Sequence, residues 1–267
     1  GGKALQLSVI KRDLQLPIPS GFVITTNAFY YFIEYNDLRK PIDEILSGLD
    51  INSTPSLDKA SHELVQLIMN SRTPPDIEDA VLNAFKVCQW TKNQDIRIAM
   101  RSSAVCEDEQ SSFAGQYLTV LNVKEDSILD AYKKVIASKY SPRALYYRIN
   151  YGLSDIETPM AVLALEMIDA AASGIIYTKD LNDPTSMHLN IHSIWGLGEL
   201  LVRGEVSSDV ITVTKEKNPR IVLEKTGVKH KQMILSKNQP TEVVPVDNDK
   251  KQIRSIDHTS VLTLAEW

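Results

Sequence analysis

The sequence predicts an α+β fold in two lobes, the first rich in helices and the second rich in strands. Apolar residues recur at helical spacing through residues 1–90, and the pattern changes to a strict alternation after Asp95. From Met160 onward, short apolar and β-branched runs are separated by polar, turn-like residues. With 267 residues, 43% of them hydrophobic, the chain can bury a core in each lobe. We expect a binding cleft between the lobes.

Residues 1–90 are predicted to hold one short strand, residues 22–24, among several helices. The first helix, residues 5–12, should end before residues 17–19, because the two prolines there have no amide hydrogen to donate. Thr26 and Ser56 are predicted to cap two further helices with their hydroxyl side chains, and Pro74-Pro75 to open a third.

The middle of the chain combines two strands with two helices. Side chains alternate in character over residues 96–101, and this period of two predicts a strand. A second strand is predicted over residues 117–123. Helices should follow from about Asp126 and again from Ser141 to Gly152, where a Ser-Pro start and a glycine end form a typical cap pair.

After Met160 the sequence favours strands. Five stretches fit that pattern: residues 160–168, 172–180, 188–195, 209–215 and 220–226. The first of them is ambiguous, because its alanine, leucine and methionine residues would also suit a helix.

Composition excludes several classes of function. The net charge is −5 without a basic stripe, which excludes an extended nucleic-acid groove. No apolar run reaches the roughly 18–20 residues that span a bilayer. Two cysteines, Cys88 and Cys106, make neither a disulfide framework nor a metal knuckle. We therefore expect a cytoplasmic protein with reduced thiols.

A long polar segment, residues 102–116, separates two of the predicted strands. Arg101 lies on the face opposite the apolar side chains, so its guanidinium can project at the end of its strand. Ser102 and Ser103 add neutral donors, and glycine in the turn of residues 112–116 lets backbone amides approach a ligand. A fork of donors and an amide-lined turn suit phosphate oxygens. The alternative is an ordinary polar loop with a surface arginine.

Two weaker motifs flank this segment. Gly1-Gly2-Lys3 precedes a helix and could place an ammonium over a phosphate, or it could be an expression scar. The second motif is residues 195–209, "WGLGELLVRGEVSSD". Its glycines let the backbone approach a neighbour closely, and that neighbour is either a ligand or a helix packed on a sheet. Within it, Glu199 and Asp209 could bind a metal or a ribose, or be solvated carboxylates or caps.

Taken in order, these motifs resemble the nucleotide-binding domain of the phosphoenolpyruvate synthase and pyruvate phosphate dikinase family. The matching stretches are "GGKALQL", "LPIPSGFVITT", "RSSAVCEDEQSSFAGQYLTVLNV", "ASGIIYTKD" and "WGLGELLVRGEVSSD". The resemblance implies a two-lobed ATP-grasp fold with the nucleotide in an interlobe cleft. The domain would cover residues 1–267, truncated at its C-terminal end, with sub-lobes of approximately 1–166 and 167–267.

Carried over residue by residue, the resemblance implies an ATP site. Lys3 and Arg101 would hold phosphate oxygens as the catalytic residues, with Ser102 beside them. The turn of residues 112–116 would close over the β- and γ-phosphates through Ser112, Ala114, Gly115 and Gln116.

The resemblance also implies where the adenine lies. The segment Glu166-Met167-Ile168 would receive the base through backbone groups, which makes residues 160–168 a strand, and Glu199 is assigned to the nucleotide as well. Glu166 stands where the family commonly has glutamine. Its carboxylate could accept the amino hydrogen of adenine.

The family's magnesium ligands follow the equivalent of "LTLAEW", whereas this chain stops at Trp267. The resemblance therefore implies ATP and Mg²⁺ as cofactors but no metal ligand here. It also implies separate phosphohistidine and pyruvate-binding domains in the parent protein. That protein would convert ATP, pyruvate and water to AMP, phosphoenolpyruvate and phosphate, and we expect this chain alone to bind ATP weakly without turnover. Two alternatives are a rifampin-type antibiotic phosphotransferase and a degenerate, non-catalytic nucleotide-binding domain.

Overall fold

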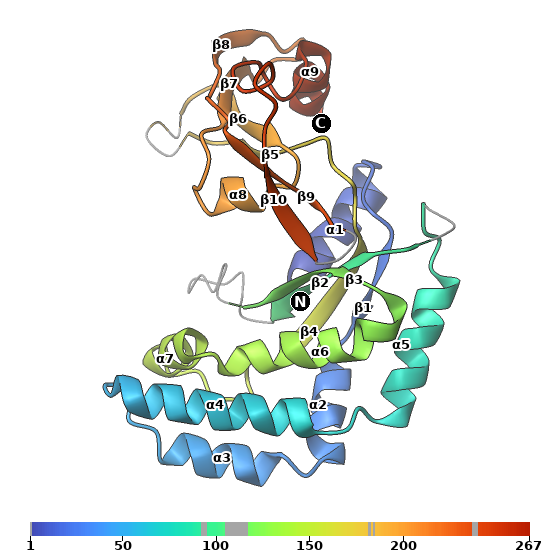
Figure 1. Cartoon of the computed structure of the whole chain (residues 1–267), viewed down its shortest axis with the longest axis vertical. Helices are drawn as coiled ribbons and strands as arrows, with labels where there is room; N and C mark the ends of the chain where they lie inside the picture. The colour runs from blue at the N-terminus through green and yellow to red at the C-terminus, as the bar shows by residue number, and fades with distance from the viewer. Residues whose placement is uncertain (1, 92–94, 105–116, 181–182, 184, 237–239) are drawn as a thin grey trace. The chain divides into compact units, whose positions relative to one another are not determined.

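The computed structural model describes residues 2–91, 95–104, 117–180, 183, 185–236 and 240–267. It divides into two compact units, Gly1–Met167 (unit 1) and Ile168–Trp267 (unit 2). Helices and strands both contribute, as Figure 1 shows, and the predicted α+β class is confirmed. None of the helices in the described part of the chain is long and apolar enough to cross a membrane.

Unit 1 is a four-stranded antiparallel sheet with helices packed on it. Its elements are α1 (Gly2–Asp13), β1 (Gly21–Ile24), α2 (Thr26–Tyr35), α3 (Arg39–Ser47), α4 (Thr54–Asn70), α5 (Pro75–Val87), β2 (Ile98–Ala104), β3 (Thr119–Val123), η1 (Glu125–Ser127), α6 (Ile128–Ala137), η2 (Ser138–Tyr140), α7 (Pro142–Asn150) and β4 (Met160–Glu166). The strand order is β1-β4-β2-β3. The ambiguous segment at Met160 is therefore a central strand.

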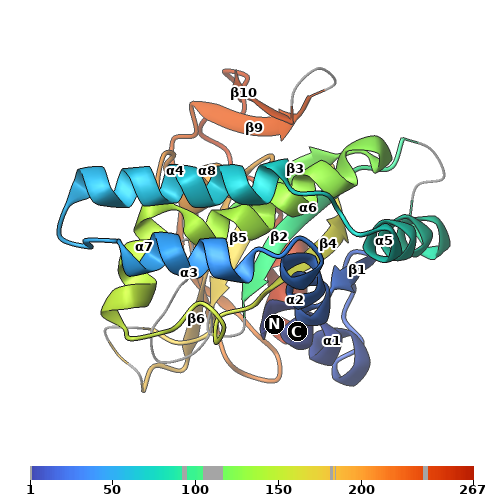
Figure 2. The ribbon, with the colours of Figure 1, turned by 90° about the horizontal axis from the view of Figure 1, so that it is seen from below.

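The sheet of unit 1 has two different faces. Ile98 and Met100 of β2, together with Val162 and Ala164 of β4, lie in one buried core cluster with the helices. Figure 1 shows α3, α4 and α6 below the strands and α1 above them, and Figure 2 shows α4 running beside α6, with which it packs. We call the side packed by α2 and α6 the helix-covered face. The opposite side is the Arg101 face.

Two predicted N-cap residues are wrong, by one and by three positions. Thr25, not Thr26, is the N-cap of α2, and it makes no side-chain capping bond. Ser53, not Ser56, caps α4, since its hydroxyl accepts the Ser56 amide. Ser56 instead accepts the amide of Asp50 through its own hydroxyl. Hydroxyl residues are clustered before α4, so composition alone cannot choose among them.

A buried ionic cluster joins α3, η2 and α7. One oxygen of the Asp155 carboxylate lies 2.8 Å from both Lys139 Nζ and Arg148 Nη1, and the other lies 3.6 Å from Arg39 Nη1. Tyr140 donates its hydroxyl to the same carboxylate at 3.3 Å. Burial lowers the pKa of Lys139 to about 8, although the Asp155 charge opposes that effect.

This pKa predicts a pH dependence of stability. The folded chain releases the Lys139 proton near pH 8, whereas the unfolded chain holds it until about 10.5. The contribution of Lys139 to the free energy of unfolding is therefore largest above pH 10.5, where the lysine is neutral in both states. That contribution is lost as the pH falls through 8. Between pH 7.5 and 9.5, this lysine should therefore raise the free energy of unfolding by about 1–2 kcal/mol. Urea unfolding of Lys139→Met at the two pH values should lack that rise, and an equal pH slope in both proteins would contradict the assignment.

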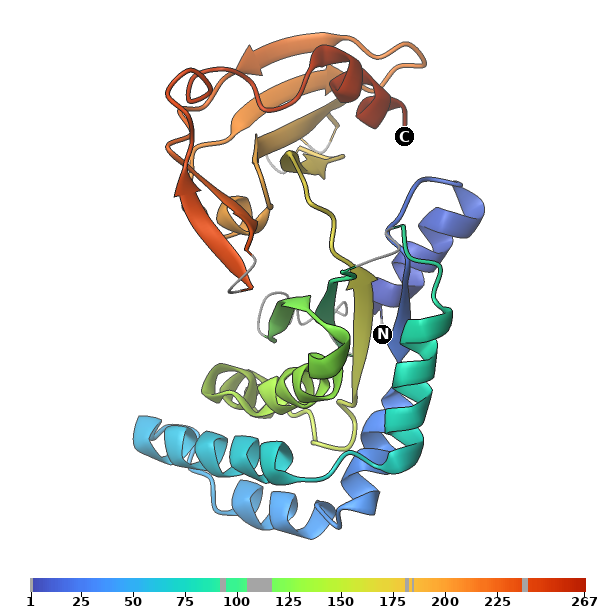
Figure 3. The ribbon, with the colours of Figure 1, turned by 45° about the vertical axis from the view of Figure 1, so that its right-hand side comes forward.

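Unit 2 consists of a second antiparallel sheet, a hairpin and two helices. Its elements are β5 (Ala172–Tyr177), β6 (His188–Trp195), α8 (Glu199–Val202), β7 (Asp209–Thr214), β8 (Ile221–Lys225), β9 (Lys231–Leu235), β10 (Thr241–Pro245) and α9 (His258–Glu266). The sheet has the order β5-β6-β7-β8, and β9 pairs with β10. Figure 3 shows α9 lying along this sheet, where Val261 completes an apolar cluster with β6 and β7.

Candidate functional site

Arg101 lies in the middle of β2 rather than at its end. The strand continues to Ala104, with Arg101 opposite Leu163 of β4 on one side and Thr119 of β3 on the other. Its side chain is exposed, whereas Ile98 and Met100 are fully buried. The predicted face is thus correct and the predicted strand end is wrong, because the ladder with β4 supplies partners for the next three residues.

The two serines after Arg101 point to opposite faces. Ser102 points to the same side as Met100 and is buried on the helix-covered face. Its hydroxyl therefore cannot contact a ligand on the Arg101 face, and only its backbone can. Its carbonyl accepts a hydrogen bond from Lys3 Nζ at 3.1 Å. Ser103 shares the parity of Arg101 and is also buried, and its hydroxyl has no hydrogen-bond partner among the described residues.

The structure therefore places Lys3 against the residue that follows Arg101. Lys3 lies in the first turn of α1, and α1 contacts β2. Two cations that are 98 positions apart in the sequence are brought to one part of the sheet. The predicted turn residues Ser112, Ala114, Gly115 and Gln116 lie outside the described residues.

In the segment Glu166-Met167-Ile168, which follows the end of β4, two backbone amides already donate hydrogen bonds within the protein. Glu166 donates its amide to Ser20 O at 2.8 Å, and Met167 donates to Arg97 O at 2.9 Å. Met167 is buried, and Ile168 is exposed. Two of the three amides proposed for adenine thus already have partners within unit 1.

The carboxylate of Glu166 points away from the Arg101 face. Glu166 pairs with Ile98 in the ladder and so shares its parity on the helix-covered face. Its oxygens accept the Thr91 amide at 3.1 and 3.0 Å, and one of them also accepts the Thr91 hydroxyl. The sequence offered no signal for Thr91, because 75 residues separate the two partners.

An aromatic cluster holds the Thr91 segment. The Trp90 ring lies 5.1 Å from the Phe85 ring and 6.4 Å from the Phe22 ring, measured between centroids. Its indole nitrogen donates to Phe85 O at 2.8 Å. The chain after α5 is therefore fixed both by ring packing and by the contact with Glu166.

Of the two acidic candidates in the glycine-rich segment of unit 2, Glu199 is partly exposed. It is the first residue of the short helix α8, and its carboxylate lies 3.4 Å from Arg203. Gly196, three residues before this helix, approaches protein rather than open space: a Cβ there would lie 2.3 Å from the Met233 carbonyl oxygen. Packing against β9 thus accounts for Gly196.

Asp209, the other candidate, is fully buried, so it is not a solvated carboxylate, and both of its oxygens are held by protein partners rather than left for a metal or a ribose. One carboxylate oxygen forms an ion pair with Lys229 and accepts the Gly227 amide at 3.0 Å. The other accepts both the amide and the hydroxyl of Ser255 at 2.7 Å. Lys229 is fully buried as well. Asp209 therefore ties β7 to two later segments of unit 2.

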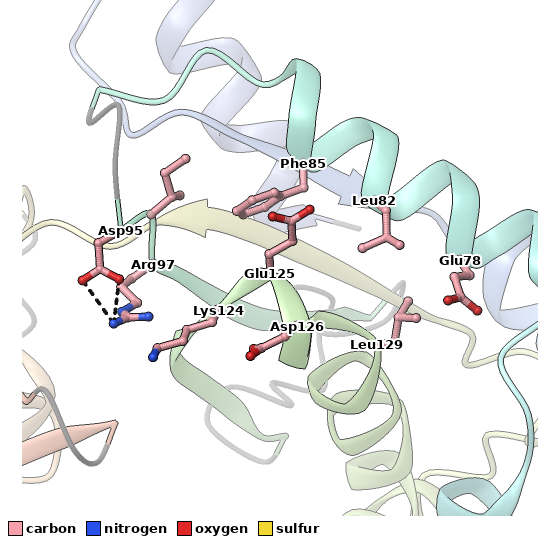
Figure 4. Close-up of a pocket in the computed structure, with 10 residues that line it drawn as sticks. Glu78, Leu82, Phe85, Asp95, Arg97, Lys124, Glu125, Asp126 and Leu129 are labelled. Atoms are coloured by element: carbon pink, nitrogen blue, oxygen red, sulfur yellow. Dashed lines mark hydrogen bonds and ion pairs between the residues drawn. The ribbon is translucent and has the colours of Figure 1, made fainter.

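A hollow of about 620 Å³ lies between α5 and the start of α6. Figure 4 shows Phe85 and Leu82 on one side and Lys124, Glu125 and Asp126 on the other. Arg97 closes one end through an ion pair of 2.8 Å with Asp95. None of the predicted site residues that the structure describes lines this hollow. Within the described part of the chain, no group of three His, Cys, Asp or Glu side chains could hold a metal ion.

Comparisons with known proteins agree with the motifs over the full chain. Residues 1–267 match the family described as pyruvate phosphate dikinase, AMP/ATP-binding domain. The chain is 35% identical to phosphoenolpyruvate synthase of Aquifex aeolicus, which it covers to 33% of that protein's length. It is 31% identical to the Escherichia coli phosphoenolpyruvate synthase and 33% identical to a probable one from Methanocaldococcus jannaschii, covering 35% and 22% of them.

These matches include all of this chain, although it spans about a third or less of each of these relatives. A family match across every residue is more specific than any single motif. The chain belongs to the pyruvate phosphate dikinase AMP/ATP-binding domain family.

Proposed function

We propose that the chain is the ATP-binding domain of a phosphoenolpyruvate synthase-type phosphotransferase with an ATP-grasp arrangement. The observation that carries the proposal is the exposed guanidinium of Arg101 in mid-strand, next to a backbone carbonyl that holds Lys3. The relatives named phosphoenolpyruvate synthase favour pyruvate and water as acceptors over a rifampin-type antibiotic. A cytoplasmic location belongs to the same proposal and fits the free thiol of Cys88.

The residues on the Arg101 face suit a nucleotide. A planar guanidinium and an ammonium bind phosphate oxygens through charge-assisted hydrogen bonds. Leu165 shares the parity of Arg101 on the neighbouring strand, is partly exposed and provides apolar surface. The chain continues from there to Met167 and Ile168, where we place the adenine. With the Glu166 and Met167 amides committed, the Ile168 amide is the donor of this segment for the base.

In the proposed reaction, Arg101 and Lys3 hold the triphosphate in line with an acceptor. Their positive charge stabilises the negative charge that develops on the transferred phosphoryl oxygens. Magnesium, when bound, would neutralise the triphosphate. A histidine of another domain would accept one phosphoryl group and pass it to pyruvate, water would take the other as inorganic phosphate, and AMP would be released. This acceptor chemistry is proposed for the whole protein, since the chain spans only part of its relatives.

Isothermal titration calorimetry tests nucleotide binding directly. Mg-ATP titrated into the chain should give saturable heat with one site per chain, whereas Mg-CTP should bind more weakly because cytosine cannot occupy an adenine position equally well. Absence of saturable heat with Mg-ATP at millimolar concentration would overturn the proposed function.

A further inference from the structure

We propose that Glu166 and Thr91 form a latch that positions the adenine-binding segment, and that the Glu166 carboxylate does not contact the base. The inference rests on the proposed ATP-binding function. It assigns Thr91 as a positioning residue of the nucleotide site. It also gives Glu166 a different role from direct recognition of the adenine amino group.

The first argument is direction. β4 alternates its side chains, so Glu166 points to the helix-covered face together with Ala164 and Val162, while Leu163 points to the Arg101 face. A base that lies with its phosphates on the Arg101 face is separated from the Glu166 carboxylate by the sheet. The backbone of residues 166–168 can still reach that base from the strand end.

The second argument is the match of donors to acceptors. Thr91 presents two donors, its amide and its hydroxyl, and the Glu166 carboxylate supplies acceptors for both. Glu166 is only 5% exposed, and a buried carboxylate needs such donors to offset its lost hydration. A glutamine side chain has one acceptor oxygen and two N–H donors, so it would satisfy Thr91 less completely.

The third argument is what the latch holds in place. Three separate contacts fix residues 166 and 167: the Glu166 side chain on Thr91, the Glu166 amide on Ser20 and the Met167 amide on Arg97. The Thr91 end is itself anchored by the packing of Trp90 on Phe85. A segment that is ordered before the ligand arrives has less conformational freedom to lose on binding. The latch should therefore strengthen nucleotide binding without selecting the base.

The two roles of Glu166 predict different behaviour toward inosine triphosphate, which has an oxo group in place of the adenine amino group. A carboxylate in contact with the base would favour ATP, and its replacement by an amide would change the ratio of the two affinities. A latch affects both nucleotides equally. Thr91 does not contact the base under either role of Glu166. Replacing Thr91 should therefore change the nucleotide affinity only if the latch exists.

The test measures dissociation constants of Mg-ATP and Mg-inosine triphosphate for the unchanged chain, Thr91→Val, Glu166→Gln and the double variant. Each single variant should weaken both nucleotides by the same factor, roughly threefold to tenfold, as expected for one lost charge-assisted hydrogen bond that acts indirectly. In the double variant, the backbone amide of residue 91 is the one remaining donor, and the side-chain oxygen of Gln at position 166 is the one remaining acceptor. It should bind as well as either single variant, so the effects are not multiplicative.

Two controls make the result specific. Thr54→Val changes an exposed threonine at the start of α4 and should leave both constants unchanged. Thr91→Ser keeps both donors and should bind like the unchanged chain even if Thr91→Val folds poorly. The latch is overturned if Glu166→Gln changes the affinity ratio, or if folded Thr91→Val binds ATP normally. Failure of the unchanged chain to bind ATP would instead overturn the proposed function.

Discussion

Replacing Arg101 with alanine should weaken Mg-ATP binding by about a hundredfold, because the change removes two charge-assisted hydrogen bonds to phosphate. Arg101 is exposed in mid-strand and its neighbours in the ladder, Leu163 and Thr119, carry no charge that could replace it. The loss should be smaller for AMP than for ATP, since we propose that Arg101 holds oxygens of the transferred phosphoryl group, which AMP lacks. Calorimetry with the two nucleotides measures both effects.

Arg143→Ala is the matched control for this experiment. Arg143 is an exposed arginine in the first turn of α7, so its removal changes the net charge by the same amount. It should leave the ATP affinity unchanged within about twofold, because a distant charge is screened at physiological ionic strength. Equal losses in the two variants would mean that Arg101 acts only through net charge.

The second large effect is on stability. Asp209→Asn should lower the free energy of unfolding by about 3–5 kcal/mol, because it leaves the buried Lys229 ammonium without a counter-charge. The same change also weakens the contact with Ser255. Denaturant unfolding followed by circular dichroism measures the loss, and Asp249→Asn, an exposed aspartate of the same unit, should cost less than about 0.5 kcal/mol.

A double replacement separates the ion pair from simple packing. Asp209→Leu combined with Lys229→Met removes both charges, so it should be less destabilising than Asp209→Asn alone. If the double variant is as unstable as the sum of its single variants, the hydrogen bonds to Gly227 and Ser255 matter more than the charge pair.

The predictions that held are those that depend on local periodicity. A period of two is enough to place Arg101 on the face opposite Ile98 and Met100, whatever the strand pairs with. The end of that strand could not be predicted, since Ser102 to Ala104 are strand residues only because β4 lies beside them. Helix α3 was missed although Ile42, Ile45 and Leu46 stand at helical spacing and pack on the core.

The contacts that were missed join residues far apart in the chain. Asp209 has the sequence context of a helix cap or a surface carboxylate, and its partners Lys229 and Ser255 follow 20 and 46 residues later. Thr91 and Glu166 are 75 residues apart. Such pairs leave no periodic signal, so they are visible only after the sheets have formed.

The most direct test of the account is a crystal structure of the chain with magnesium and a non-hydrolysable ATP analogue. The account predicts phosphate oxygens within hydrogen-bonding distance of the Arg101 guanidinium and of Lys3 Nζ, with the base against Met167 and the Ile168 amide. The Glu166 carboxylate should still accept from Thr91. A triphosphate bound on the helix-covered face, for example in the hollow beside Phe85 and Lys124, would contradict it.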